Sequence, residues 1–415
     1  MLNSIAVLGG GLAGCIVALS LAKKGFTVNL YEQHPVLMNA ASLHNEGKLH
    51  LGYVYAADPS QKTYKKMVQG VEQFSTIISQ LTDYDSKRLQ TSSPFYYIVL
   101  KASQLSLVDT RQHFARVDQA LSVSNLNLPP SIELAPCQWH KDFTADAVAT
   151  VFKTAEYSID PQQLASIIYA AVTQNENINV LTNHTILSVQ QDRAEYKIKT
   201  KSLHLLKEMQ HKYVINCLWE QRMRFDREIG LIEQRPFFIR YKATVRFYIP
   251  RLNKTPLKSL NSVTYITGPF GDVVNYQNGY LYLSWYPFSK LYESASDELK
   301  EFEARRSQLN KAEFIHKSIK RLSEFNPVLS NLHQYEKQAV VGGGYIVAWG
   351  NSDIDDEDSE LHQRHDIGVH QKDNWLSLDT GKLTTAPLLG VEAANIIEHK
   401  IRSSSTNRKL KISNA

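Results

Sequence analysis

The start of the chain contains the pattern that most constrains its fold. An apolar run at residues 5–8 leads directly into the glycine pattern G-x-G-x-x-G, which spans residues 9–14. The following residues favour a helix that ends at Gly25, and a second β-rich run covers residues 26–31. The order strand, glycine turn, helix and strand predicts an α/β fold of the Rossmann type.

Each glycine of the pattern has a distinct physical role. Gly9 permits the tight turn, Gly11 lets the backbone approach a pyrophosphate, and Gly14 lets the helix pack closely against the strand. An anion is favoured at the helix N-terminus by free N–H groups and by the helix dipole. Glu32 ends the second strand, where a carboxylate can accept hydrogen bonds from ribose hydroxyls. The predicted dinucleotide site also includes Leu12, Ala13 and Gln33.

The apolar character of residues 5–22 also allows a signal peptide or a membrane anchor. Several glycines interrupt this run at turn spacing, and no cationic segment precedes it. A membrane-spanning helix needs about 20 apolar residues. We therefore predict no transmembrane segment.

Charge and cysteine content restrict the class of protein further. The net charge of +5 is mild and suits an anionic ligand at least as well as nucleic acid. No basic block with interleaved aromatic residues is present, so we predict no nucleic-acid partner. The three cysteines are far apart and form neither a disulfide framework nor a zinc motif. We therefore expect a cytoplasmic protein.

A second motif follows Glu32. Residues 41–52 read Ala-Ser-x-x-Asn-x-Gly-x-x-His-x-Gly. Together with the N-terminal unit, this motif resembles the D-amino-acid-oxidase superfamily of FAD enzymes, in particular the branch with L-2-hydroxyglutarate and glycerol-3-phosphate dehydrogenases. The resemblance implies that this segment wraps the FAD pyrophosphate and passes the flavin ring. The positions that match the family pattern are Ser42, Asn45, Gly47, His50 and Gly52. We predict FAD contacts for Ser42, Asn45, Gly47 and Lys48.

Three histidines in this part of the chain allow different interpretations. The spacing of His34, His44 and His50 puts no obvious pair on one helical face, so we predict no metal site. Structural roles in the core are one alternative. A position beside the flavin is the other, and it makes His50 a candidate proton acceptor, since an imidazole titrates near neutral pH.

Two later segments extend the resemblance. Asp160 and Pro161 predict the start of a helix, and the strand-helix-strand block around them resembles the second part of the FAD domain. Near the C-terminus, a glycine turn precedes a predicted helix over 388–401. This turn resembles the superfamily segment that faces the flavin pyrimidine, which implies FAD contacts for Gly381, Lys382, Leu383, Thr384 and Thr385.

The middle of the chain predicts a second, mainly antiparallel sheet. In the strand 237–249, alternation places Arg240, Lys242 and Arg246 on one face. Such a face meets solvent, acidic partners or an anionic ligand. If the sheet roofs the flavin, as the resemblance implies, Arg240 or Arg246 could clamp a substrate carboxylate or phosphate. Tyr282 could complete that pocket, together with Tyr280 and Tyr286 from the same hairpin.

Two other patterns look functional but do not complete their motifs. The run Val341-Gly-Gly-Gly-Tyr-Ile-Val has valine at the third glycine position, so it predicts no second dinucleotide site. The acidic run 353–360 lacks the glycine and the distant glutamate of an EF-hand, so we expect a solvated loop there.

These patterns predict a discontinuous FAD-binding domain and a separate substrate domain. We assign residues 1–90, 151–235 and 341–405 to the first, 91–150 and 236–340 to the second, and 406–415 to a frayed tail. The predicted function is hydride transfer to flavin N5 from a C–H bond beside an amine or hydroxyl of a small, anionic substrate. A monooxygenase or halogenase using NAD(P)H and dioxygen is the alternative, and a non-catalytic FAD scaffold is a third. The electron acceptor stays open.

Overall fold

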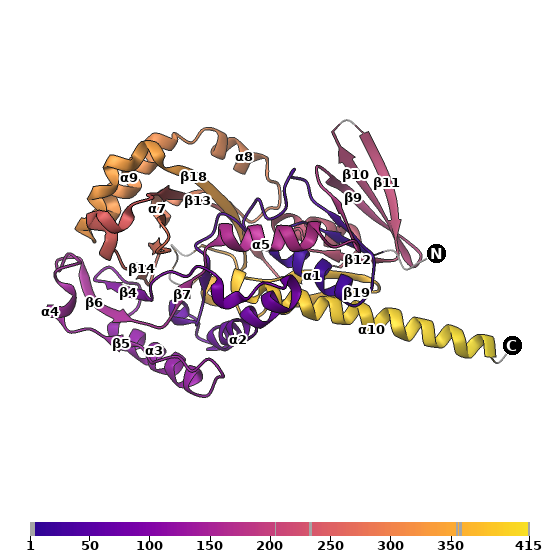
Figure 1. Ribbon diagram of the computed structural model, residues 1–415, viewed down its shortest axis with the longest axis horizontal. Coiled ribbons are helices and arrows are strands. Elements are labelled where there is room, and N and C mark those ends of the chain that lie inside the picture. The colour runs from indigo at the N-terminus through magenta and orange to yellow at the C-terminus, as the bar shows by residue number, and fades with distance from the viewer. Residues whose placement is uncertain (1–4, 204, 232–234, 354–355, 357–358, 414–415) are drawn as a thin grey trace.

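A computed structural model of the chain describes residues 5–203, 205–231, 235–353, 356 and 359–413, with side chains to residue 404. Two large sheets lie side by side, and a smaller three-stranded sheet stands at one end of the molecule (Figure 1). Among the described helices, none is both long enough and apolar enough to cross a membrane.

The first sheet has six strands in the order β19-β20-β12-β1-β2-β8. The five strands from β20 to β8 run parallel, and β19 pairs antiparallel at the edge. Three distant parts of the sequence supply these strands: β1 (Ile5–Leu8), β2 (Val28–Tyr31), β8 (Ile178–Leu181), β12 (Tyr213–Asn216), β19 (Gly368–Lys372) and β20 (Trp375–Asp379).

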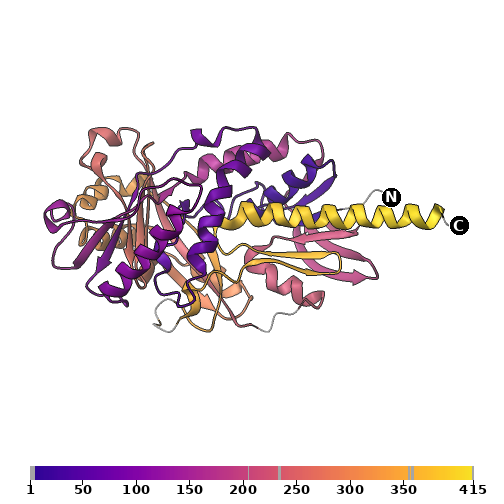
Figure 2. The ribbon, with the colours of Figure 1, turned by 90° about the horizontal axis from the view of Figure 1, so that it is seen from below.

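Helices cover the parallel sheet. Helix α1 (Leu12–Lys23) is buried along nearly its whole length and packs against α10 (Ala386–Ser413). The contact is close because a Cβ at Gly390 would lie 2.8 Å from the side chain of Ile16. The C-terminal end of α10 projects beyond the sheet (Figures 1 and 2). Other helices around this sheet are α2 (Thr63–Thr82), α5 (Pro161–Thr173) and α6 (Arg222–Glu228).

The second sheet has nine strands and is mainly antiparallel, with one parallel pair between β14 and β4. The long strand β13 pairs with β18 along one edge and with β16 and β17 along the other. Its strands are β4 (Phe95–Leu100), β5 (Ile132–Glu133), β6 (Val148–Lys153), β13 (Phe237–Tyr248), β14 (Ser262–Ile266), β15 (Gly271–Asn275), β16 (Tyr280–Trp285), β17 (Lys290–Ser294) and β18 (Val340–Trp349).

The nine-stranded sheet has its own helical cover, with α8 and α9 on its outer side (Figure 1). Buried residues of α9 join the apolar core beneath the sheet. The helices of this part are α3 (Leu107–Ser122), α4 (Pro136–Trp139), α7 (Tyr286–Ser289), α8 (Lys300–Ser307), α9 (Lys311–Ser323) and the 3₁₀ segment η6 (Pro327–Gln338).

The remaining elements are short strands and single turns. The small sheet contains β9 (Thr185–Asp192), β10 (Glu195–Ser202) and β11 (Leu205–His211), and β3 (Lys48–Leu49) pairs with β7 (Tyr157–Ser158). The 3₁₀ turns are η1 (Tyr53–Tyr55), η2 (Ser86–Arg88), η3 (Trp219–Gln221), η4 (Leu252–Lys254), η5 (Pro256–Ser259), η7 (Glu360–His362) and η8 (Leu383–Thr385).

The structure confirms the predicted α/β fold with its second, mainly antiparallel sheet. At the C-terminus, residues 406–413 of the predicted frayed tail lie within the bounds of α10, and residues 414–415 lie outside the described part of the chain. The polar stretch 122–146, which shows no clear helix or strand pattern in the sequence, contains β5 and α4. Both are too short to show a periodic pattern. The domain boundaries stay a prediction.

Candidate active site

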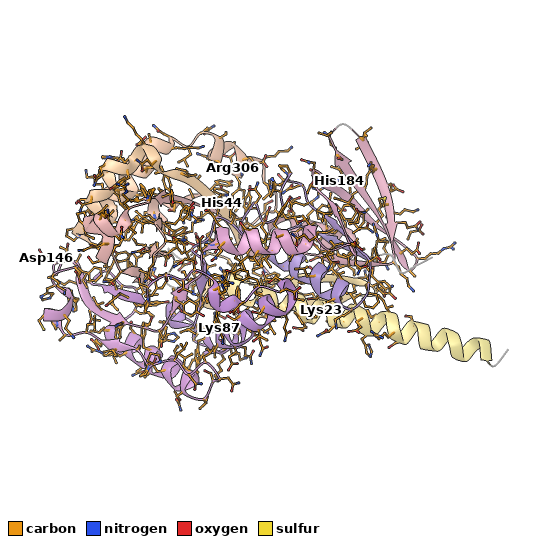
Figure 3. All side chains as sticks on the ribbon, in the orientation of Figure 1. Lys23, His44, Lys87, Asp146, His184 and Arg306 are labelled. Atoms are coloured by element: carbon orange, nitrogen blue, oxygen red, sulfur yellow. The ribbon has the colours of Figure 1, made fainter. Side chains whose placement is uncertain are left out.

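A long cavity lies between the parallel sheet and the nine-stranded sheet. It is lined at one end by His184, beside β9, and further along by His44, and both are labelled in Figure 3. At the other end, residues of β13 and β16 line it. The cavity therefore joins the predicted dinucleotide site to the predicted substrate pocket.

The glycine turn after β1 leaves room for a phosphate group. A Cβ at Gly14 would lie 1.9 Å from the carbonyl oxygen of Gly9, so the first turn of α1 can pack on the loop only with glycine there. Gly11 is the N-cap of α1. A Cβ added there would have one non-neighbouring atom within 4 Å, Ser42 Oγ at 3.1 Å. Both Gly9 and Gly11 line the cavity, so the helix N-terminus is open to an anion.

Glu32 is fixed at the end of β2 by the backbone. Its Oε2 accepts a hydrogen bond from the N–H of Gly10 at 2.8 Å, and its Oε1 accepts one from the N–H of His34 at 2.8 Å. Each carboxylate oxygen keeps a further lone pair, so the side chain can also accept from hydroxyl groups in the cavity. Gln33 lines the cavity beside it.

The loop that follows is held in shape by Asn45. Its amide donates to the carbonyls of Ala41 and Ser42 at 2.8 and 3.0 Å and accepts from the N–H of Gly47 at 2.6 Å. Ser42 Oγ accepts a hydrogen bond from the N–H of Leu12 at 2.9 Å, so the loop also closes on the start of α1.

The glycine triplet of β18 allows this loop to lie against the nine-stranded sheet. A Cβ at Gly342 would lie 2.4 Å from His44 Nδ1, and a Cβ at Gly344 would lie 2.9 Å from the Cα of Ala41. A side chain at either position would push the loop away. The run that resembles an incomplete dinucleotide motif thus serves close packing beside the cavity.

His50 lies deep in the cavity between two carboxylates. Its Nε2 is 3.7 Å from Glu46 Oε1 and its Nδ1 is 3.9 Å from Glu156 Oε1, distances longer than a hydrogen bond. Glu156 is held by the N–H of Leu51 at 2.6 Å and by the hydroxyl of Tyr97. Burial lowers the pKa of His50 below its ordinary value, although Glu46 acts in the opposite direction. The imidazole is therefore neutral near pH 7 and able to accept a proton.

The backbone of His50 also joins two distant segments. Its N–H donates to Thr384 Oγ1 at 3.0 Å, and that hydroxyl lies 3.3 Å from the carbonyl oxygen of Lys48. The loop after Glu32 and the C-terminal turn thus meet at one threonine.

The three cations of β13 are buried, which excludes the solvent alternative. Arg240, Lys242 and Arg246 are 5, 8 and 7% exposed. Each lies beside an acidic group, since Arg240 pairs with Asp353, Lys242 Nζ is 3.6 Å from Asp272, and Arg246 is 3.2 Å from Asp160. The structure therefore shows acidic partners for all three.

Only two of these cations line the cavity. Arg240 and Lys242 do, together with Tyr282 and Tyr286. Arg246 instead pairs with Asp160, the N-cap of α5, and lies over the rings of Tyr276 and Tyr280. Of the two arginines predicted as a clamp, Arg240 therefore lines the cavity and Arg246 does not.

Two further cations line the cavity, Arg364 and Lys382, and the sequence did not indicate that they could bind an anionic substrate. Arg364 is buried, and its guanidinium donates to the carbonyls of Val347 at 2.6 Å and Leu361 at 3.0 Å. Burial lowers the pKa of Lys382 to about 7, and the nearby Arg364, Lys242 and Arg240 lower it too. Arg364 lies in a segment without periodicity, so no sequence signal marked it.

Asp353, the first residue of the acidic run, is not exposed to solvent as the sequence predicted. This residue is buried, pairs with Arg240 and lies 3.2 Å from Lys290 Nζ. The solvated-loop prediction is therefore wrong for Asp353. The sequence could not show this, because nothing in the acidic run indicates which cation Asp353 meets across the fold. Residues 354–355 and 357–358 of the run lie outside the described residues.

A buried polar network supports the C-terminal turn. Asp379 accepts hydrogen bonds from Trp349 Nε1 at 2.6 Å and from the N–H of Gly381 at 3.2 Å. Arg222 lies 3.6 Å from Asp379 and 3.3 Å from Asp226. The network fixes the turn that carries Lys382 at the cavity wall.

Most of the residues assigned from the sequence line this one cavity: Gly9, Gly11, Leu12, Ala13, Glu32, Gln33, Ser42, Asn45, Lys48, His50, Arg240, Tyr282, Gly381, Lys382 and Leu383. The others support the walls from behind or lie elsewhere: Gly14, Gly47, Arg246, Thr384 and Thr385. Tyr55, Thr244 and Tyr265, whose buried hydroxyls have no hydrogen-bond partner, also line the cavity. A long, polar ligand such as FAD fits these walls, with phosphate at the glycine turn and ribose at Glu32.

Comparisons with known proteins agree with this geometry. The family model described as FAD dependent oxidoreductase (DAO) matches residues 4–236, more than half of the chain. L-alpha-glycerophosphate oxidase from Mycoplasma pneumoniae, solved with FAD bound, is 16% identical with a TM-score of 0.66, covering 96% of this chain and 95% of its own. Glycine oxidase from Geobacillus kaustophilus is 13% identical with a TM-score of 0.67 over the same shares.

The curated relatives match over a short segment only. The FAD-dependent monooxygenase FPY4 of Fusarium mangiferae is 44% identical over 54 residues, which is 13% of this chain and 15% of that protein. A match of this length shows a shared segment and not a shared activity. The family model, the fold and the cavity agree, and the chain belongs to the FAD dependent oxidoreductase (DAO) family as an enzyme with FAD as its cofactor.

Proposed function

We propose that the enzyme oxidises a C–H bond beside an amine or hydroxyl group of a small, anionic substrate. The observation that carries the proposal is a group of cations at the sheet end of the cavity: Arg240, Lys242 and Arg364, which are buried, and Lys382, which is partly exposed. Acidic residues near them, Asp272, Asp353 and Glu46, offset part of this charge. Burying cations without full compensation is costly, so the site favours an anion.

Arg240 and Lys242 belong to the rigid strand β13, whose backbone is paired on both edges. Arg364 is held by two backbone carbonyls, so its guanidinium has a fixed direction. A planar guanidinium can bind a carboxylate or phosphate through two parallel hydrogen bonds. These residues would orient the substrate and fix the position of its reacting carbon.

His50 is the candidate group for the proton. It is neutral near pH 7, its ring nitrogens are not hydrogen-bonded, and two carboxylates flank it. It would accept the proton from the substrate hydroxyl or ammonium, and the adjacent Glu46 and Glu156 would stabilise the imidazolium that forms. Bound FAD supplies the acceptor for the hydride.

The glycerophosphate oxidase and the glycine oxidase compared above share this fold, which is consistent with the proposal. The test is a visible spectrum of the purified protein followed by anaerobic addition of single compounds. We expect loss of the flavin absorbance with an anionic amino acid, amine derivative or 2-hydroxy acid. Loss with NADPH alone, and with none of these compounds, would instead favour the monooxygenase alternative.

A further inference from the structure

A second group of possible ligand atoms lies outside the FAD cavity, on α9 and η6. His316 of α9 and His333 and Glu336 of η6 place one ligand atom each within 4.8 Å of the others. His316 Nδ1 is 2.9 Å and His333 Nδ1 is 2.6 Å from the same oxygen, Glu336 Oε1. Among the described residues, no other group of histidine, cysteine and acidic side chains meets this criterion.

We propose that His316, His333 and Glu336 bind a divalent transition metal ion, zinc being the expected one. Two imidazoles and one carboxylate are a common ligand set for zinc with a further position left to water. The side chains of His316, His333 and Glu336 are 56, 35 and 30% exposed, so water can reach that position.

The local structure holds the ligands in place. In a 3₁₀ helix, residues three apart lie above one another, so His333 and Glu336 share one face of η6. The two elements are fixed by a shared apolar core, which Ile319 and Leu322 of α9 and Leu332 of η6 enter. His316 therefore faces the pair on η6 without any movement of the backbone.

The distances suit a metal after a small adjustment of side chains. Zinc binds nitrogen and oxygen at about 2.0–2.2 Å, which separates tetrahedral ligand atoms by roughly 3.4 Å. The two nitrogen–oxygen distances of 2.9 and 2.6 Å must lengthen by roughly 0.5–0.8 Å, which partly exposed side chains can achieve by rotation.

The metal would act as a clamp between α9 and η6. A ligand that binds only the folded state stabilises that state, so zinc is expected to raise the temperature of unfolding. The site lies outside the FAD cavity, and neither histidine lines it. The proposal is therefore independent of the substrate proposed above.

The test uses the FAD-loaded protein after treatment with a chelator and its removal. Titration with zinc chloride in a calorimeter should show one ion per chain, and zinc should raise Tm. Separate His316→Ala and Glu336→Gln variants should each weaken binding at least ~10-fold, since each removes one of three ligands. His399→Ala, which removes an exposed histidine on α10, is the control and should bind zinc like the unmodified protein.

Each outcome decides the proposal. Unchanged zinc affinity in both His316→Ala and Glu336→Gln would overturn it, and so would the lack of any saturable binding by the unmodified protein. Equal weakening in the His399→Ala control would also overturn it, because binding would then be spread over surface histidines. Because binding and Tm are measured without substrate, these results stand apart from any test of the redox activity.

Discussion

Lys48 and Asp272 form a buried ion pair, with 2.7 Å between Nζ and Oδ1, that joins strand β3 to strand β15. Lys48 Nζ also contacts Thr264 Oγ1, and it lies 4.3 Å from the centre of the Phe95 ring. Burial alone raises the pKa of Asp272, but the charges of Lys48 and Lys242 outweigh it and hold that pKa below its ordinary value. One pair thus links the segment assigned to FAD with the sheet that carries the proposed substrate cations.

The first prediction concerns this pair. Lys48→Met should lower the free energy of unfolding by about 3 kcal/mol, because it leaves a buried carboxylate with one cation fewer. Urea denaturation with excess FAD in every sample measures the change. A Lys48→Met, Asp272→Asn double variant should recover part of the loss, since the uncompensated charge is then absent. Equal urea midpoints for Lys48→Met and the unmodified protein would contradict the prediction.

The second prediction tests the phosphate cradle. Gly11→Val should abolish FAD binding in a folded protein, because the added side chain meets only Ser42 Oγ and otherwise points into the cavity. Flavin content is measured by absorbance against protein, and folding by circular dichroism. Gly368→Ala is the control, because no atom lies within 4 Å of its added Cβ. Full flavin occupancy in a folded Gly11→Val protein would show that the pyrophosphate does not bind at this position.

The third prediction assigns the proton to His50. His50→Gln should slow flavin reduction by substrate about 100-fold to 10,000-fold while FAD stays bound, the usual effect of losing a general base. Stopped-flow absorbance measures the rate. His34→Gln serves as the control, because His34 also lines the cavity and its hydrogen bonds with Glu32 and Asn183 are made by its backbone, which the substitution retains. Reduction of the His50→Gln protein at the original rate would leave His50 with a structural role.

The same residue predicts a pH profile. The pKa of His50 is lowered from 6.5, mainly by burial, so the neutral base persists below pH 6.5. The rate of flavin reduction should therefore fall as the imidazole becomes protonated, and the midpoint of this fall should lie below pH 6.5. The profile is measured from pH 5 to 8 with the unmodified protein. A midpoint above pH 7 would assign the titration to a different group.

The fourth prediction concerns Lys382. Its pKa of about 7 means that it loses its charge as the pH rises through neutrality. Since an anionic substrate binds the protonated amine better, KM should increase above pH 7, and binding should take up a proton. Lys382→Met should raise KM at low pH and remove this pH dependence. A KM that changes with pH equally in both proteins would exclude Lys382 from substrate binding.

The fifth prediction compares two arginines of one strand. Arg240→Gln should reduce kcat/KM by roughly 10-fold to 100-fold with FAD retained, as expected when a hydrogen bond to a charged group is lost. Arg246→Gln should lower stability, because Asp160 loses its buried partner, but leave kcat/KM of the folded protein unchanged. Equal kinetic losses in both variants would place the substrate elsewhere along β13.

The sequence alone determined the nucleotide end of the site, because the signals there are local. The turn at Gly9, the N-terminus of α1 and the carboxylate of Glu32 all belong to one βαβ unit, whose geometry follows from residues that are close in sequence. The Asp160 N-cap of α5 and the buried face of α2 were predictable for the same reason, as capping and helical periodicity act within a few residues.

Only the tertiary structure decided the composition of the substrate end. Alternation put Arg240, Lys242 and Arg246 on one face of a strand, but Lys242 and Arg246 are separated by roughly 13 Å along it. Which of these side chains lines the cavity depends on how strand β13 lies relative to the parallel sheet. Arg364 and Lys382 join this end from segments more than a hundred residues away in the chain. No local pattern encodes that meeting, because long-range packing sets the positions of buried charges and thereby their partners and pKa values.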